Sequence, residues 1–326
     1  MIAPYLLRLL CLCLASFFLL NFLLGLAASL ASRAAVRIAE TMRPRTATGL
    51  LFTLRVLPAT LAVGMVLGLC IPSYLWLEPQ AAPERVGLAC LTLAFLGALG
   101  GILALARTAH AVVVSLRCRR TWREAGYEAS LPGEQSRVVV VEKDSPVLAL
   151  AGVLRPRLII SGAVLRALSR EQLALAFDHE NAHRGSRDNL KRLLLLLAPD
   201  SIPFVTGFSM LDRAWARFSE WAADDQAARG DSHRAVCLAA ALLCVARMGA
   251  IPRLSVLHTS LVPGDHDLSA RIDRLLRSEL DRSRAFPEAR HRIGGAALLS
   301  AGSLLTLLYW PATLCSVHRL LELFLR

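Results

Sequence analysis

The 326-residue chain has little lysine, few aromatic residues and no paired cysteines, and each shortage argues against a class of protein. Its only lysines are Lys143 and Lys191, so the formal net charge of +12 comes almost entirely from arginine. Aromatic residues make up 6% of the chain, and no RNA-binding aromatic pattern, zinc-finger spacing or basic recognition helix accompanies the arginines, which argues against direct nucleic-acid binding. The eight cysteines form no Cys-x-x-Cys pair, so we expect neither a disulfide framework nor a thiolate zinc site.

Hydrophobic residues, in contrast, make up 55% of the chain and are concentrated in long runs without a charge. A run of roughly 18 or more apolar residues is long enough to cross a bilayer as a helix. The sequence therefore predicts a multi-pass α-helical membrane protein, in contact with membrane lipid, with about four spans: Leu9 to Ser32, Val56 to Leu77, Val86 to Ala106 and Ile293 to Val317. We expect three spans in residues 1–117, a soluble domain in 118–290 and a fourth span in 291–326.

The arginines that flank these runs predict the orientation of the protein. Four arginines lie between Arg33 and Arg45, after the first span, whereas the short loop after the second span has only Arg85. By the positive-inside rule, the first loop and the soluble domain face the cytoplasm. Small residues from Ala28 to Ser32 would also suit signal-peptide cleavage. The first run is longer than the usual apolar core of about 7–15 residues in such a peptide, so we expect a retained span.

The soluble domain begins with short segments typical of strands and continues with a helix. Arg137–Val141 and Arg157–Ser161 are β-branched runs bounded by turn residues, and Val147–Gly152 between them predicts a third strand, at a sheet edge. Ser169 followed by Gln172 predicts a capping box at the start of a helix. The soluble domain is therefore expected to be α+β.

Two further apolar stretches, Leu193–Leu197 and Ile202–Leu211, are each too short to span a bilayer. Pro199 and Asp200 separate them. The sequence leaves open whether they form a hairpin in a protein core or a lip that rests on the membrane.

The strongest chemical motif is His179-Glu180-Asn181-Ala182-His183, on the predicted helix. Residues four apart lie one turn apart on the same face, so both imidazoles can bind one tetrahedral zinc ion at about 2.0–2.1 Å. Glu180 can then accept a proton from a water that the zinc activates. The alternative is a surface helix with two solvated histidines.

A pair of acids further along the chain can complete such a site. Glu220 and Asp224 lie one turn apart on a helix predicted from about Leu211 to Arg229. One acid can bind the metal while the other accepts the proton of a histidine ligand's distal ring nitrogen, which fixes the ring. Two acids at this spacing are, by themselves, typical of a solvated face, and the spacing leaves open which acid would bind the metal.

Together these motifs resemble those of the gluzincin membrane peptidases. The resemblance covers about Ser145 to Leu276 and includes the HExxH motif, Arg187-Asp188-Asn189 behind it, the Glu-x-x-x-Asp pair and a trailing segment from Arg271 to Leu276. Three spans, a cytoplasmic peptidase domain and a closing span are similar to the BlaR/MecR-type antirepressor peptidases. The CAAX prenyl protease/HtpX type shares the motifs but distributes its spans differently.

The resemblance implies a zinc metallopeptidase domain in which His179, His183 and Glu220 are ligands, Glu180 is the base and Asp224 supports a ligand. It also implies that an extended substrate pairs by strand addition with the segment Val147, Leu148, Ala149, Leu150, Ala151 and Gly152. The implied location is the bacterial inner membrane, with the catalytic domain in the cytoplasm. The implied substrate is a cytoplasmic protein, either a transcriptional repressor or the protease itself.

Two features depart from the family pattern. Asp178 stands before the motif where an apolar residue is expected, and its charge there would change the properties of the first ligand, His179. The sequence ends at Arg326, so we expect no extracellular penicillin-binding sensor and do not carry β-lactam sensing over. We assign no group that stabilises the oxyanion, and we expect His258, His266 and Arg271 to be ordinary polar residues.

Two other functions stay open. One is a catalytically silent scaffold or sensor that keeps zinc as a structural clip, although a purely structural site has no need of Glu180. The other is a membrane-protein quality-control peptidase of the HtpX type, which the number of predicted spans disfavours.

Overall fold

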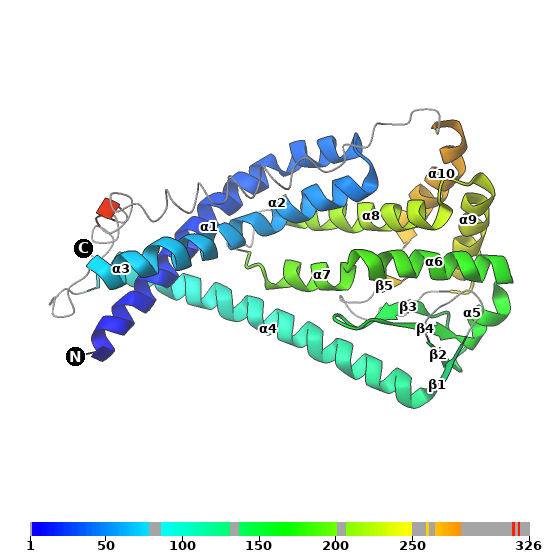
Figure 1. Ribbon diagram of the computed structural model, residues 1–326, viewed down its shortest axis with the longest axis horizontal. Helices are drawn as coiled ribbons and strands as arrows, with labels where there is room; N and C mark the ends of the chain where they lie inside the picture. Colours follow the sequence, from blue (N-terminus) through cyan, green and yellow to red (C-terminus); the bar gives the residue numbers. More distant parts are fainter. Residues whose placement is uncertain are drawn as a thin grey trace.

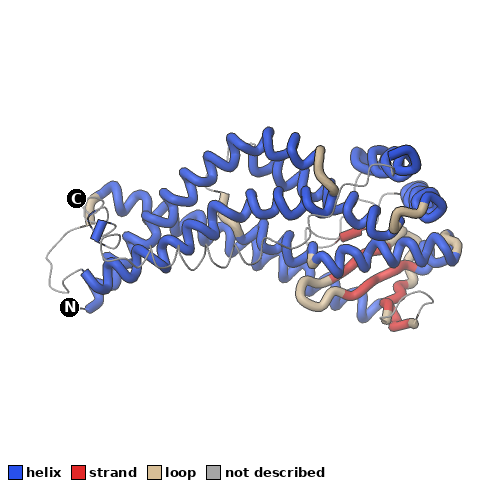
Figure 2. The backbone as a smooth tube through the Cα atoms, turned by 45° about the horizontal axis from the view of Figure 1, so that its top comes forward, coloured by secondary structure: helices blue, strands red, loops and turns tan. Residues whose placement is uncertain are grey.

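The computed structural model is an elongated molecule with long helices at one end and an α/β domain at the other (Figures 1 and 2). It describes residues 2–77, 86–130, 137–200, 207–249, 259–260 and 265–281, together with 315, 316 and 319.

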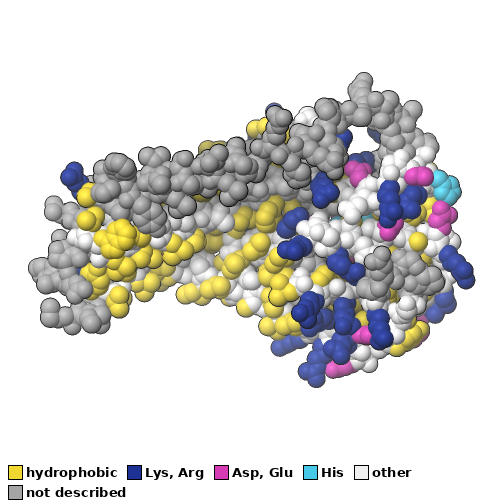
Figure 3. Space-filling model, viewed as in Figure 1, with side chains coloured by type: hydrophobic (Ala, Val, Ile, Leu, Met, Phe, Trp, Pro, Cys, Tyr) yellow, Lys and Arg dark blue, Asp and Glu magenta, His cyan; other side chains and the backbone are white. Residues whose placement is uncertain are grey.

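Three long helical segments form the elongated end of the molecule. They are α1 (Ile2–Glu40), α2 (Pro44–Met65) with its continuation through the π-helical turn η1 (Val66–Cys70) into α3 (Ile71–Leu77), and α4 (Leu88–Ala125). Each segment is long and apolar enough to cross a membrane. Hydrophobic side chains predominate on the part of this end that Figure 3 draws in colour, whereas charged side chains gather on the α/β end. The first three predicted spans thus coincide with apolar helices of membrane-spanning length.

The helices differ from the predicted spans in their ends. The last helix continues to Ala125, past the predicted domain boundary at residue 117, because the arginine-rich segment that follows the apolar run has no helix-breaking residue. The predicted fourth span, Ile293 to Val317, lies outside the described residues apart from residues 315 and 316.

The α/β domain contains a five-stranded mixed sheet in the order β1-β2-β4-β3-β5. The central β2 and β4 are parallel, and the other neighbouring pairs are antiparallel. The strands are β1 (Gly126–Ala129), β2 (Val138–Val141), β3 (Leu148–Ala151), β4 (Arg157–Ser161) and β5 (Thr259–Ser260). The three strands predicted from the sequence are therefore confirmed.

The predicted position of β3 at the sheet edge needs correction, because β5 pairs with it on the side away from β4. Ala149 is opposite Ser260 and Leu150 is opposite Thr259, in antiparallel register. A strand of two residues has no periodicity that a sequence pattern could reveal. An added substrate strand would therefore have to replace β5.

Of the helices that follow β4 in the described residues, α5 and α6 contact the sheet. These helices are α5 (Gly162–Ala167), α6 (Arg170–Ser186), α7 (Asp188–Leu197), α8 (Gly207–Ala228), α9 (Ser232–Arg247) and α10 (Asp265–Asp281). The predicted capping box begins α6: the Gln172 amide donates to Ser169 Oγ at 3.2 Å, and the Ser169 amide donates to Gln172 Oε1 at 3.0 Å. One face of α6 packs into the main core, where Phe177 is fully buried.

Helices α7 and α8 join the α/β domain to the membrane helices. Leu195 and Leu211 share one hydrophobic cluster with Ala47 and Leu51 of α2. The buried Arg55 of α2 adds ion pairs, 2.6 Å to Asp200 and 3.1 Å to Asp212. The described parts of this stretch pack against α1, α2 and α4, and the choice between the two alternatives that the sequence left open stays a prediction.

Candidate metal centre

Two neighbouring helices bring the predicted ligands together. His179 and His183 lie on α6, Glu220 lies on α8, and the two helices run side by side (Figure 1). All three residues are buried, and their ligand atoms lie within 4.8 Å of one another. The group could hold a metal ion.

The distances between the candidate ligand atoms fit a tetrahedral ion. The two histidine Nε2 atoms are 3.2 Å apart, and Glu220 Oε2 lies 3.5 Å from Nε2 of His179 and 3.6 Å from that of His183. Metal–ligand bonds of about 2.0–2.1 Å at tetrahedral angles place ligand atoms about 3.3–3.4 Å apart. The three side chains therefore need little movement to bind one ion.

Each histidine has a carboxylate at the ring nitrogen that faces away from this group. His183 Nδ1 lies 2.7 Å from Asp188 Oδ2, and His179 Nδ1 lies 3.0 Å from Asp224 Oδ1. Such a contact fixes the ring orientation and leaves Nε2 for a metal. The position of Asp224 agrees with the role that the resemblance implied for it.

Asp188 was not singled out from the sequence, although it belongs to the Arg-Asp-Asn segment behind the motif. Arg187, the residue between α6 and α7, has a left-handed backbone with φ of 56°. Asp188 follows it as the first residue of α7, and Ser219 Oγ of α8 donates at 2.8 Å to the same Asp188 Oδ2 that contacts His183. The Arg-Asp-Asn segment was the only signal that could have identified it.

The expectation that Arg271 is an ordinary polar residue is wrong. Arg271, on α10, is 1% exposed and forms two hydrogen bonds to Asp224, 2.8 Å from Nε and 2.7 Å from Nη2. Its Nη1 atom lies 3.3 Å from Glu220 Oε2. The trailing segment of the family resemblance, which begins at Arg271, pointed to this position. His258 lies outside the described residues, and no side-chain position is described for His266.

The electrostatics of the centre favour positive charge among its carboxylates. Burial lowers the pKa of His183, but Glu220 and Asp188 outweigh it and raise that pKa to about 10. Burial raises the pKa of Asp188, yet its hydrogen bond with His183 and the charge of that ring lower it to about 2. Burial also raises the pKa of Asp224, but Arg271 and His179 together outweigh it and lower that pKa to about 2. A metal cation would supply positive charge of the kind that these buried carboxylates stabilise.

Glu180, the predicted base, follows His179 on α6 and is fully buried. It does not belong to the three-ligand group. Burial lowers the pKa of Arg271, but the carboxylates of Asp224, Glu220 and Glu180 outweigh it and raise that pKa above its usual value. Glu180 is therefore within electrostatic range of the centre.

Asp178, the residue before the motif, forms ion pairs with two arginines that are not among the candidate ligands. Its Oδ2 atom lies 2.6 Å from Arg234 Nη2 and 3.3 Å from Arg229 Nη2. These two arginines pair with the carboxylate, and the expected effect of Asp178 on the first ligand stays a prediction.

The segment predicted to bind substrate lies next to this centre. Residues 147–152 are all buried, and β3 contacts α6. Asn189, beside Asp188 on α7, donates from Nδ2 to the carbonyl oxygens of Leu150 at 3.1 Å and Gly152 at 2.8 Å. The same helix turn thus contacts both a histidine of the centre and the predicted substrate strand.

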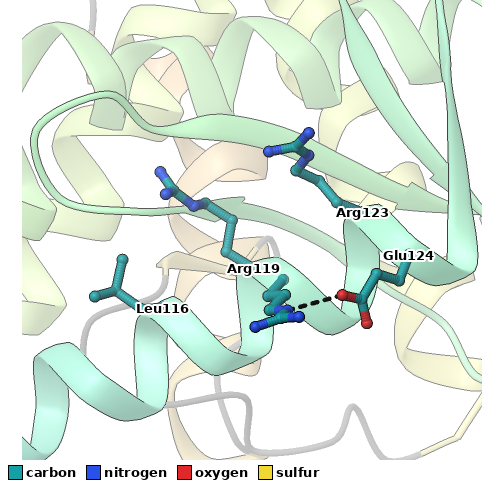
Figure 4. Close-up of a pocket in the computed structure, with 5 residues that line it drawn as sticks. Leu116, Arg119, Arg123 and Glu124 are labelled. Carbon is teal, nitrogen blue, oxygen red and sulfur yellow. Dashed lines mark hydrogen bonds and ion pairs between the residues drawn. The ribbon is translucent and has the colours of Figure 1, made fainter.

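A pocket lies along the last turns of α4 (Figure 4). Arg120 and Glu124 form an exposed ion pair there, at 2.8 Å. No residue of the metal centre is among those described in its lining, which are Leu116, Arg119, Arg120, Arg123 and Glu124.

No model of a known protein family matches the chain, and a search of curated proteins found no match either.

Proposed function

We propose that the chain is a membrane-embedded zinc endopeptidase whose catalytic domain faces the cytoplasm of a bacterium. The observation that carries this proposal is the buried group of His179, His183 and Glu220, with a carboxylate behind each histidine. This arrangement supports the resemblance to gluzincin membrane peptidases that the HExxH and Glu-x-x-x-Asp motifs suggested.

The donor set favours zinc over other metals. Two imidazoles and one carboxylate suit zinc, whereas calcium and magnesium prefer sites built from oxygen ligands. A structural zinc site usually has four protein ligands, whereas a catalytic site keeps its fourth position for water or substrate. Among the described residues the group offers three ligands, which favours catalysis over the silent scaffold.

Each residue then has a distinct chemical task. Zinc, when bound, supplies a Lewis acid that polarises water and the substrate carbonyl. The carboxylate of Glu180 accepts a proton from the attacking water and returns it to the leaving amine. Asp188 and Asp224 hold the histidine rings, while Arg271 keeps Asp224 and Glu220 ionised and in place.

The proposed substrate is a protein segment in extended conformation. The side of β3 away from β4 accepts β5 as an antiparallel strand, which supports strand addition as the binding mode. Because β5 comes from the same chain, the protease itself is a candidate substrate beside a cytoplasmic repressor. A substrate in trans would have to displace β5 before it could pair.

The proposal can be tested on the full chain purified in detergent. We expect about one zinc ion per chain, cleavage of an unfolded protein such as β-casein, loss of cleavage on chelation and recovery with zinc. His183→Ala should lose both zinc and cleavage. His233→Ala, which changes an exposed histidine paired with Glu171, should keep both. Cleavage that persists in fully chelated protein would contradict the proposal.

A further inference from the structure

The side of β3 that faces away from β4 can be identified from one backbone hydrogen bond. The Ser161 amide donates to the carbonyl oxygen of Val147 at 2.8 Å. Hydrogen-bonded positions alternate along an antiparallel pair, so Val147, Ala149 and Ala151 direct their backbone groups toward β4. The carbonyls of Leu148, Leu150 and Gly152 therefore point to the side where β5 lies and where an added strand would bind.

Asn189 already occupies two of these three carbonyls. Its Nδ2 atom donates to Leu150 O and Gly152 O, which uses both hydrogens of the amide NH2 group. The residue is 3% exposed, so these bonds are shielded from water. The side chain thus binds the end of the segment, beginning at Leu150, where β5 also pairs with β3.

The other end of the same amide is an acceptor that lacks a donor among the described residues. Asn189 Oδ1 is buried and has no hydrogen-bond partner among the described residues. A buried carbonyl oxygen without a hydrogen-bond partner lowers the stability of the folded protein. A peptide N–H is a suitable donor for it.

Gly152 and Asp188 hold this arrangement in place. Gly152 has φ of +106°, a conformation that favours glycine, so the chain leaves the strand direction at this residue. Asp188 precedes Asn189 and contacts His183 at 2.7 Å. Consecutive residues therefore position a candidate ligand and the end of the strand.

We infer that Asn189 is a substrate-positioning residue: its Nδ2 ends the pairing of an added strand at Leu150, and its Oδ1 accepts a backbone N–H of that strand. This inference rests on the proposed function, because it assumes that a peptide binds along β3. As a consequence, a bound peptide can pair with β3 only as far as Leu150. This limit determines where the peptide lies relative to the metal centre.

The limit can be tested by binding, without any cleavage. The zinc-loaded full chain is titrated with peptides that carry a terminal hydroxamate and grow by one residue at a time. In the parental protein the affinity should rise with length and then level off once the peptide reaches Leu150. Hydrogen–deuterium exchange should show protection by the bound peptide at the amides of Leu148 and Leu150, which face the side where the added strand binds. An affinity that rises without levelling, or no protection of these amides, would overturn the inference.

Variants of Asn189 sharpen the same test. Asn189→Ala should keep its zinc, lower the affinity for the longer peptides by about 2- to 10-fold, and let the affinity keep rising past Leu150 because two carbonyls are released. Asn189→Asp should bind these peptides more weakly still, since a carboxylate cannot donate to the two carbonyls. Glu171→Gln, an exposed change on α6, should match the parental protein. The inference would be overturned if Asn189→Ala bound every peptide with the parental affinity and its affinity stopped rising at the same peptide length.

The two proposals can fail separately. Peptides that bind with the expected length limit to a chain that never cleaves would support the role of Asn189 and contradict the peptidase. Zinc-dependent cleavage with no effect of Asn189 on the length limit would support the peptidase and contradict the role of Asn189.

Discussion

His183 Nδ1 lies 2.7 Å from Asp188 Oδ2, and this contact ties the metal centre to the first turn of the neighbouring helix. Asp188 also receives a hydrogen bond from Ser219 and lies 3.2 Å from Lys191 Nζ. The carboxylate therefore joins α6, α7 and α8 at one point. Because α7 and α8 pack against the membrane helices, the ligand geometry depends on how the domain sits on those helices.

The first prediction concerns this carboxylate. Asp188→Asn should lower zinc affinity by about 10- to 100-fold, because the amide holds the His183 ring less firmly and weakens it as a ligand. Zinc affinity can be measured by competition with a chelating dye. Asp178→Asn is the matched control on α6, since Asp178 pairs with Arg234, and it should bind zinc like the parental protein. Equal affinities for the two variants would contradict the role of Asp188.

The second prediction separates the two acids of α8. Glu220→Ala removes a candidate ligand and its charge, so the purified variant should be largely free of zinc. Asp224→Asn keeps every ligand and should hold zinc at saturating metal, with about 10- to 100-fold weaker affinity or turnover. Asparagine is preferred to alanine because Asp224 also binds the buried Arg271. Metal analysis decides the assignment, and a zinc-free Asp224→Asn beside a loaded Glu220→Ala would invert it.

The third prediction concerns Arg271. Arg271→Ala leaves Asp224 buried without its main partner, and breaking a buried ion pair in this way costs about 3–5 kcal/mol of stability. Thermal unfolding of the detergent-solubilised variant should show a melting temperature well below that of the parental protein. Arg274→Ala, a change to a more exposed ion pair three residues further on, should cost about 0–1 kcal/mol. Similar melting temperatures for both variants would show that Arg271 is not a central support.

Local patterns predicted much of this molecule. The spacing of His179 and His183 places both on one face of any α-helix, and the Ser169 and Gln172 capping box defines its start. The apolar runs and the β-branched segments predicted three membrane-length helices and three strands for the same physical reason, because each is a property of neighbouring residues.

Contacts between distant segments were harder to predict. Arg271 meets Asp224 across 47 residues of sequence, and its burial has no local signature. Asp188 contacts His183 from the start of the next helix, and β5 pairs with β3 at two described positions that lie more than 100 residues further along the chain. In each case the residue type indicates only that a buried polar group needs a partner. Which residue becomes that partner depends on the fold.

The fourth prediction tests the orientation that the arginine distribution favours. A reporter that is active only in the cytoplasm should be active when fused near Gly133 and inactive when fused near Ala82. A periplasmic reporter at the same two positions should give the opposite result. The reverse pattern would place the metal centre outside the cytoplasm and exclude cytoplasmic repressors as substrates.

The most direct test of the proposed zinc peptidase is a paired measurement of zinc content and β-casein cleavage on the Glu180→Gln variant. Glutamine has nearly the same shape as glutamate but cannot accept the proton, and Glu180 is not among the three candidate ligands. We predict about one zinc ion per chain, as in the parental protein, and cleavage slower by at least about 100-fold. A zinc-loaded Glu180→Gln variant that cleaves at the parental rate would contradict the proposed mechanism.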